Sequence, residues 1–229
     1  HRRPVGFGGR VLGEGEPKYL NSPESIIYHK GEILYGLHVA KQAIQEQEAV
    51  ILVEGYFDLL MLHQHGVKQS VATSGTALTA QHIRILKRYT SNFITAFDGD
   101  AAGIQAALRS LPLFLEEGIW AKTVLLPKGE DPDSFLRKGN LADFQKRVAA
   151  ALPLFDFFLD QLTKRHDARS LPGKVSIAEE GMSLLRRIPE GIRRTFYVKA
   201  LAEKVGLQET VLYEMVKAPV REARRDEDA

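Results

Sequence analysis

The apolar and polar positions divide the chain into three parts, and the middle part, residues 49–139, has the clearest pattern. Continuous apolar runs typical of buried strands alternate with stretches in which apolar residues recur every three or four positions, as in helices. The strand-like runs are "AVILVE", "SVATSG", "NFITAF" and "WAKTVLLP". The helix-like stretches are "YFDLLMLHQHG", "TAQHIRILKRY" and "AAGIQAALRSLPLFLEEG". This alternation predicts an α/β domain with a mainly parallel sheet flanked by helices.

The two flanking parts have different patterns. Residues 1–48 hold glycine-rich turns and short β-prone pieces, and they end in a predicted helix near 36–46. Residues 140–229 lose the strand pattern. Their helical spacing recurs in "FDFFLDQL", "KVSIAEEGMSLLRRI", "RRTFYVKALAEKVG" and "ETVLYEMV". We therefore expect a bundle of four or five helices, ending in the charged linker "REARRDEDA".

Two local signals bear on the helices of the middle part. Thr79 stands where the second helix begins and predicts an N-cap. Pro112 lies inside the third helix and predicts a kink or a break, because proline cannot donate the helical hydrogen bond.

The composition excludes several kinds of site. The 229 residues include no cysteine, which removes disulfides, thiol catalysis and thiolate metal sites. No apolar run approaches the ~20 residues of a membrane helix, so we expect no membrane partner. The absence of cysteine fits a cytoplasmic protein. The formal net charge is only +2, so any contact with nucleic acid must come from a local basic patch.

Acidic side chains gather where the predicted strands end, in the motifs "LVEGYFD", "FDGDAAG" and "GEDPD". The six acids are Glu54, Asp58, Asp98, Asp100, Asp131 and Asp133. Since ligands of open α/β sheets bind at the carboxyl ends of the strands, we expect these acids to converge. Side-chain alternation predicts that Asp98 and Asp100 point to the same side, with Gly99 allowing a tight turn between them.

Converging carboxylates imply bound cations, because like charges repel strongly at low dielectric. A ligand set of carboxylates alone suits a hard ion such as Mg²⁺ or Mn²⁺, with two or more ions in the site. The chemistry implied is phosphoryl or nucleotidyl transfer, or phosphodiester hydrolysis. Each motif alone is also typical of a surface turn or a helix start, so the ordered set carries the inference.

These three acidic motifs, in this order on an α/β alternation, resemble the Toprim domain. The upstream segments "GFGGR", "PKYLNSPES" and "HKGEILYG" extend the similarity to bacterial replicative primases of the DnaG family. The resemblance implies a Toprim catalytic subdomain at 49–139. It also implies that residues 1–48 form the C-terminal part of the N-terminal subdomain of the primase core. Residues 140–229 would then form the helical subdomain.

The resemblance implies a DNA-dependent RNA polymerase that makes short primers for DNA replication by two-metal nucleotidyl transfer. Its substrates would be a single-stranded DNA template and ribonucleoside triphosphates. By matching position, the expected catalytic residues are Glu54, Asp58, Asp98 and Asp100. All six acids are candidate metal ligands, and Glu54 is also a candidate general acid or base.

The resemblance also implies a basic surface for nucleotide and template. The matching residues are Arg10, Lys18, Tyr19, Asn21 and Lys30. Arginine and lysine contact phosphates without reading the sequence, and a tyrosine ring can stack on a base.

Family members carry further modules, and we expect those outside this chain. Zinc is expected only in an N-terminal module, and the replicative helicase is expected to bind a domain beyond the C-terminus. The resemblance also implies that a small subdomain supplying part of the template-binding groove precedes the matched region, so the chain alone is expected to be weakly active or inactive.

Four alternatives remain open. Two are Toprim enzymes, a topoisomerase subunit or an OLD-type nuclease. The others are a non-catalytic Toprim binding module and a Mg²⁺ phosphohydrolase of another α/β fold. The six acids count against the binding module, and the upstream segments count against the phosphohydrolase.

Overall fold

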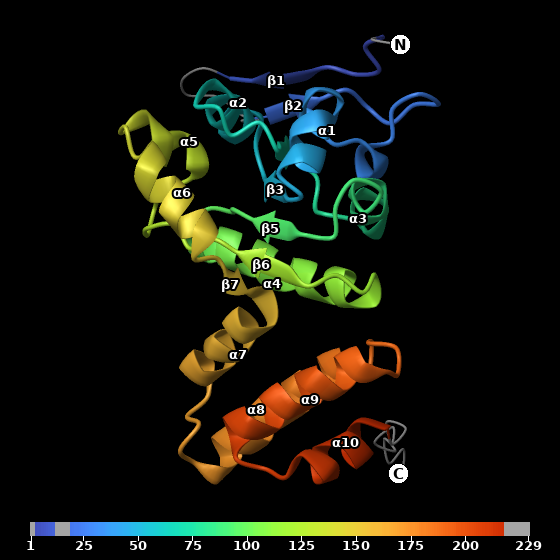
Figure 1. The fold of residues 1–229 in the computed structure, drawn as a ribbon, viewed down its shortest axis with the longest axis vertical. Coiled ribbons are helices and arrows are strands. Elements are labelled where there is room, and N and C mark those ends of the chain that lie inside the picture. The colour runs from blue at the N-terminus through green and yellow to red at the C-terminus, as the bar shows by residue number, and fades with distance from the viewer. Residues whose placement is uncertain (1–2, 12–18, 218–229) are drawn as a thin grey trace, which may run out of the picture. The chain divides into compact units, whose positions relative to one another are not determined.

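The computed structural model describes residues 3–11 and 19–217, which divide into two compact units between residues 154 and 155. The units are described separately. The first unit contains a five-stranded sheet (Figure 1). Its strands are β3 (Val50–Val53), β4 (Ser70–Ala72), β5 (Phe93–Thr95), β6 (Ala121–Thr123) and β7 (Leu152–Pro153). Its helices are α1 (Leu37–Glu46), α2 (Tyr56–Gln64), α3 (Ala80–Leu86), α4 (Ala101–Glu116), α5 (Pro132–Arg137) and α6 (Leu141–Ala149).

The strands lie in the order β4–β3–β5–β6–β7. Pairing is parallel between β3 and β4, β3 and β5, and β5 and β6, and it is antiparallel between β6 and β7. The predicted α/β fold with a mainly parallel sheet is therefore confirmed. Thr79 also caps α3 as expected, since its side chain accepts a hydrogen bond from the backbone N–H of His82 at 3.1 Å.

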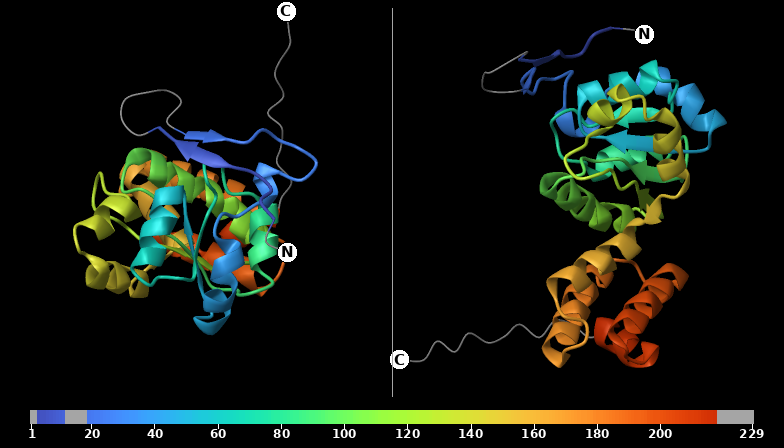
Figure 2. Two further views of the ribbon diagram at one scale, coloured as in Figure 1. Left: turned by 90° about the horizontal axis from the view of Figure 1, so that it is seen from above. Right: turned by 90° about the vertical axis from the view of Figure 1, so that its left-hand side faces the viewer.

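Helices cover both faces of the sheet (Figure 2). Residues one apart on a strand point to opposite faces, so Ile94 and Phe93 of β5 belong to different layers. Ile94 packs in a core cluster with residues of α2, α5 and α6, among them Leu62 and Phe144. The ring of Phe93 instead meets the ring of Phe114 in α4, with centroids 5.6 Å apart. The apolar strands are thus buried on both faces, which explains their continuous runs.

Hydrogen bonds of polar side chains hold the segment before the sheet against the sheet domain. This segment comprises the antiparallel strands β1 (Gly8–Arg10) and β2 (Tyr19–Asn21) and the short helix η1 (Lys30–Glu32). The side-chain amide of Asn21 donates to the carbonyl oxygen of Ser74 at 2.9 Å and accepts from the hydroxyl of Tyr56. The buried His82 lies with Nε2 3.1 Å from the carbonyl oxygen of Lys30. These contacts fix the hairpin beside the carboxyl ends of the strands.

The second unit is helical throughout its described part. Its helices are α7 (Leu154–Arg165), α8 (Leu171–Leu185), α9 (Ile192–Val205) and α10 (Glu209–Lys217). Arg186 and Arg194 donate to the carbonyl oxygens of Met215 and Val216, at 3.1 and 3.0 Å, and so satisfy acceptors at the end of α10. The expected C-terminal helical region is confirmed. The predicted linker, residues 221–229, lies outside the described residues.

Three expectations need correction. Strands do not stop at residue 139, because β7 pairs with the edge strand β6. Residues 141–149 form α6, which packs in the first unit through Phe144, so the compact units divide later than the predicted boundary at 139/140. Finally, the break predicted at Pro112 does not occur, because α4 continues through that residue. The neighbouring Leu111 and Phe114 are buried, and their packing offsets the lost hydrogen bond.

Among the described helices, none combines the length and the apolar character that crossing a bilayer requires.

Candidate metal and nucleotide site

A cavity of about 580 Å³ opens where β3 and β5 end. Five of the six acids predicted from the sequence line it. They are Glu54, Asp58, Asp98, Asp131 and Asp133. Two arginines, Arg10 and Arg109, line the same cavity. The predicted convergence at the sheet edge is therefore observed for these five acids.

The first motif turns directly from strand to helix. Glu54 follows β3, and Gly55 is the N-cap of α2 in an extended conformation. Asp58, in the first turn, accepts a hydrogen bond at Oδ2 from the backbone N–H of Gly55 at 2.9 Å. This bond satisfies one of the free N–H groups at the helix start and orients the carboxylate.

The second motif is held against the loop of the third by its glycines. The backbone N–H of Gly99 donates to the carbonyl oxygen of Glu130 at 2.7 Å. A Cβ at Gly99 would lie 2.1 Å from the carbonyl oxygen of Pro127, and one at Gly103 would lie 2.2 Å from that of Asp98. Gly99 is not among the glycines with positive φ. Close packing, rather than a left-handed turn, therefore requires glycine at this position.

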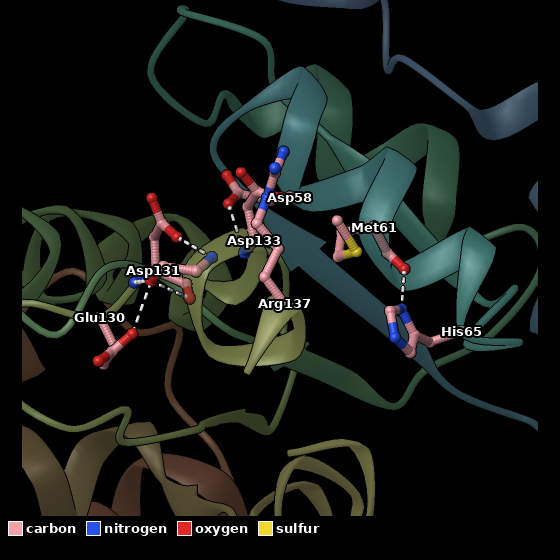
Figure 3. Close-up of polar contacts among 8 residues, drawn as sticks. Asp58, Met61, His65, Glu130, Asp131, Asp133 and Arg137 are labelled. Atoms are coloured by element: carbon pink, nitrogen blue, oxygen red, sulfur yellow. Dashed lines mark hydrogen bonds and ion pairs between the residues drawn. The ribbon is translucent and has the colours of Figure 1, made fainter. Parts of the chain in front are cut away.

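The third motif begins α5 beside α2 (Figure 3). Asp131 caps α5 by accepting from the backbone N–H of Ser134 at 2.6 Å. The backbone N–H of Asp133 donates to Oδ1 of Asp58 at 3.2 Å, and the Asp133 side chain accepts from Nε of Arg137 at 2.8 Å. Pro132 stands at the start of α5, and from the sequence alone this motif could equally be an ordinary surface turn. In the structure the turn borders the acidic cavity.

Burial and mutual repulsion raise the pKa of two acids. Asp58 is only 7% exposed, and burial, followed by the charge of Asp131, raises its pKa to about 7. The N–H bond from Gly55 opposes this rise. Burial, followed by the charge of Asp98, raises the pKa of Glu54. Both acids thus lie in surroundings that favour the protonated form unless a cation is added.

The donor set fits a hard divalent cation. Oε1 of Glu54 is buried and accepts no hydrogen bond from any described residue, although a buried carboxylate oxygen normally has a partner. The other candidate donors around the cavity are carboxylates too, which suits Mg²⁺ or Mn²⁺. In this arrangement, no three acids or histidines of the described residues are grouped closely enough to hold an ion. The assignment of metal ligands therefore stays a prediction.

Asp100 has a different position from the other five acids. Its Oδ1 accepts from the backbone N–H of Gly103 at 2.8 Å and so caps α4. It is exposed and is not among the residues that line the cavity. The two aspartates of "DGD" thus have separate surroundings, although we expected them to act from the same side. The role of Asp100 as a ligand stays a prediction.

The residues predicted to bind nucleotide and template also differ in their surroundings, since only some of them line a cavity. The guanidinium of Arg10 lies 4.9 Å from the ring centroid of Phe57 at the acidic cavity. Both ends of the Asn21 side chain are used within the chain, as described above. Lys30 lines a second cavity of about 370 Å³, which Arg10 also lines. Lys18 and the side chain of Tyr19 lie outside the described residues.

Sequence reasoning missed Arg109. It lies on α4 at the acidic cavity, nine residues beyond the helix cap Asp100. The helical spacing from Asp100 could have indicated it only if the helix were known to border the site.

Family models match most of the chain. Residues 51–136 match a model described as Toprim-like. Residues 1–41 match the N-terminal domain of the DNA primase catalytic core. Residues 155–210 match the DnaB-helicase binding domain of primase. The last match corrects our expectation that the helicase-binding domain lies wholly outside this chain.

Similar proteins and structures agree with these models. A DNA primase of Pasteurella multocida is 45% identical over 209 residues, which is 90% of this chain and 36% of that protein. The matched region thus spans only about a third of the length of this curated relative. The crystal structure of a DNA primase domain from Pseudomonas aeruginosa has a TM-score of 0.85 and 39% identity, covering 93% of this chain and 68% of that one.

A second solved structure is a DnaG primase catalytic domain bound to single-stranded DNA. It has a TM-score of 0.81 and 39% identity, and the match covers 90% of this chain and 67% of that one. The fold, the order of the acidic motifs and these similarities agree, and the chain belongs to the DnaG family of bacterial DNA primases.

Proposed function

We propose that this chain is part of the catalytic core of a primase, which synthesises RNA primers on a single-stranded DNA template from ribonucleoside triphosphates. The observation that carries the proposal is the cavity at the carboxyl ends of the strands, which five carboxylates and two arginines line. The described single-stranded DNA complex of a similar catalytic domain supports the choice of template. A cytoplasmic location follows from this proposal, because replication takes place there in bacteria.

The carboxylates have distinct proposed roles. Glu54, Asp58 and Asp98 would hold Mg²⁺ or Mn²⁺, with Asp131 and Asp133 beside them. Once bound, the ions would lower the pKa of the attacking hydroxyl and offset charge on the phosphate. Oε1 of Glu54, which has no hydrogen-bond partner among the described residues, would accept the proton of that hydroxyl.

The backbone arrangement would keep these groups in place during the reaction. Asp58 accepts two backbone hydrogen bonds, from Gly55 at 2.9 Å and from Asp133 at 3.2 Å. They orient its carboxylate from two different elements, so little reorganisation is needed when a ligand enters. Arg10, stacked on Phe57, would contact phosphate at the mouth of the cavity.

The proposal is tested in two steps. Mn²⁺ binding is measured by calorimetry for the chain and for the double variant Asp98→Ala, Asp100→Ala. A matched control is Asp143→Ala, because Asp143 lies on α6 in a surface ion pair with Arg147. We expect binding by the parent and the control and loss in the double variant. Extension of an RNA primer annealed to a DNA template, followed on a gel, should be weak with the parent and absent with the double variant.

The alternatives predict other outcomes. A nuclease would degrade the template in the same reaction without incorporating ribonucleotides. A non-catalytic module would bind no Mn²⁺, with or without a nucleoside triphosphate. Extension that persists in the double variant would refute the assignment of the acids.

The match of residues 155–210 favours a second proposal, that the helical unit contacts the replicative helicase. Surface plasmon resonance of the chain on immobilised helicase tests it. We expect binding that the double variant Ile192→Glu, Phe196→Glu weakens, because both side chains are exposed on α9, at 75% and 56%. If the chain does not bind, the contact requires a part of the primase beyond this chain.

A further inference from the structure

Arg109 stands apart from the other polar side chains around the acidic cavity, because it is a cation that no sequence motif indicated. It lies in the middle of α4 and lines the cavity together with Glu54 and Asp98. It is near enough to Glu54 that its charge lowers the pKa of that acid, against the larger effect of burial. The guanidinium is therefore within electrostatic reach of the carboxylates without being bound to them.

Other arginines in the described residues are held by acids of the chain. Arg84 pairs with Glu117 at 2.7 Å, Arg137 with Asp133 at 2.8 Å, and Arg147 with Asp143 at 3.0 Å. Arg109 makes no hydrogen bond or ion pair of this kind with any residue that the structure describes. Its five N–H donors remain available to a ligand.

The surface of α4 around Arg109 leaves room for such a ligand. The helix lines the cavity with Ala106, Arg109 and Ser110, which lie on one face at spacings of three and four. The hydroxyl of Ser110 is directed away, since it donates to the carbonyl oxygen of Ala107 at 2.6 Å. Arg109 is thus the one long polar side chain among the described α4 residues that line the cavity.

We propose that Arg109 binds a phosphate group of the ligand in this cavity, an inference that rests on the proposed function. A guanidinium matches the oxygens of a phosphate group in a bidentate geometry, and carboxylates alone would repel that group. The carboxylates would hold the cations that offset the charge of the phosphate, and Arg109 would bind the phosphate from α4. The phosphate comes either from the nucleoside triphosphate or from the backbone of the DNA template.

The test compares Arg109→Ala and Arg109→Lys with the parent chain. Arg88→Ala is the matched control, since Arg88 is exposed, carries the same charge and lines neither cavity described above. Calorimetry gives the affinity for Mn²⁺ alone and for ATP with Mn²⁺. Fluorescence anisotropy gives the affinity for a short oligodeoxythymidylate. Thermal melting checks that each variant is folded.

Arg109→Ala should weaken binding of one of the two phosphate ligands by roughly 10- to 100-fold, the range for a charge-assisted contact. Arg109→Lys should fall between the parent and Arg109→Ala, because lysine keeps the charge but loses the bidentate geometry. A loss for ATP alone identifies the nucleotide as the source, and a loss for the oligonucleotide alone identifies the template. Mn²⁺ affinity should stay the same or increase once the nearby positive charge is removed.

Three results would overturn the inference. In the first, Arg109→Ala binds both ligands as Arg88→Ala does. In the second, Mn²⁺ affinity falls as far as ligand affinity, which would mean that Arg109 only supports the acidic cluster. In the third, the parent binds neither phosphate ligand. Failure of the proposed function would give a different result, namely a parent that binds no Mn²⁺. Such a parent could still bind ATP through Arg109, so the two failures are distinguishable.

Discussion

The raised pKa of Asp58 makes the stability of the first unit depend on pH in a predictable direction. In the folded chain this pKa is about 7, compared with an ordinary value of 3.8. The folded state therefore holds the proton more tightly than the unfolded chain does. Its contribution to stability is complete below about pH 4 and is lost as the pH rises to about 7. One pKa unit corresponds to about 1.4 kcal/mol, so the full loss is about 4 kcal/mol at most.

The substitution Asp58→Asn isolates this effect, because asparagine stays neutral at every pH. Asparagine also replaces an acceptor oxygen by a donor, and one of the two backbone hydrogen bonds is lost at a cost that does not depend on pH. We therefore expect the difference in unfolding free energy between variant and parent to move in favour of the variant by roughly 2–4 kcal/mol between pH 4.5 and pH 8. Other titrating groups cancel in this difference unless they contact Asp58 directly.

Urea unfolding with EDTA present provides the assay. Trp120 is the only tryptophan in the chain and precedes β6, so its fluorescence follows the first unit. Adding Mn²⁺ at pH 8 should then stabilise the parent more than the variant. A free-energy difference that is the same at both pH values would refute the argument that burial and the neighbouring charge of Asp131 control Asp58.

Three further predictions concern the scaffold of the site. Gly99→Ala should cost roughly 1–3 kcal/mol in urea unfolding and weaken Mn²⁺ binding, because its Cβ meets a backbone oxygen at 2.1 Å. Gly9→Ala, with nothing within 4 Å of the added Cβ, is the control and should change little. Asn21→Ala should cost roughly 1–3 kcal/mol and increase hydrogen exchange in the β1–β2 hairpin, through the loss of two hydrogen bonds. Thr79→Ala should lower the thermal midpoint by removing about 1 kcal/mol of cap energy, and an unchanged midpoint would contradict that role.

Several parts of the fold could be predicted because the signal is local. The buried strands are continuous apolar runs, and the helices between them have regular spacing. The elements missed from sequence are those whose signal is weak or misleading. The strand β7 is two residues long and contains Pro153, and proline argues against a strand except at an edge such as this one. The helix α4 continues through Pro112 because burial on both sides outweighs the local penalty.

The candidate site was predictable in its position but not in its details. The rule that ligands bind at the carboxyl ends of parallel strands brought the acidic motifs together correctly, since five acids line one cavity. The rule could not predict that Asp98 lines the cavity while Asp100 does not. Asp100 instead caps α4, and this role depends on how the chain turns into that helix. The rule also could not identify Arg109, which lies only nine residues beyond Asp100 but lines the cavity because α4 borders it.

The sequence by itself determined the strands β3 to β6 with the helices between them, the carboxylate chemistry and the family resemblance, because these depend on residue type and short-range spacing. Only the tertiary structure decided which acids share a cavity, which of them are buried enough to raise their pKa values, and that Arg109 lines the same cavity. Those properties depend on distances between segments that are far apart in the chain, such as the contact of Asp133 with Asp58 across 3.2 Å. Local patterns carry no such distances, so packing determines them.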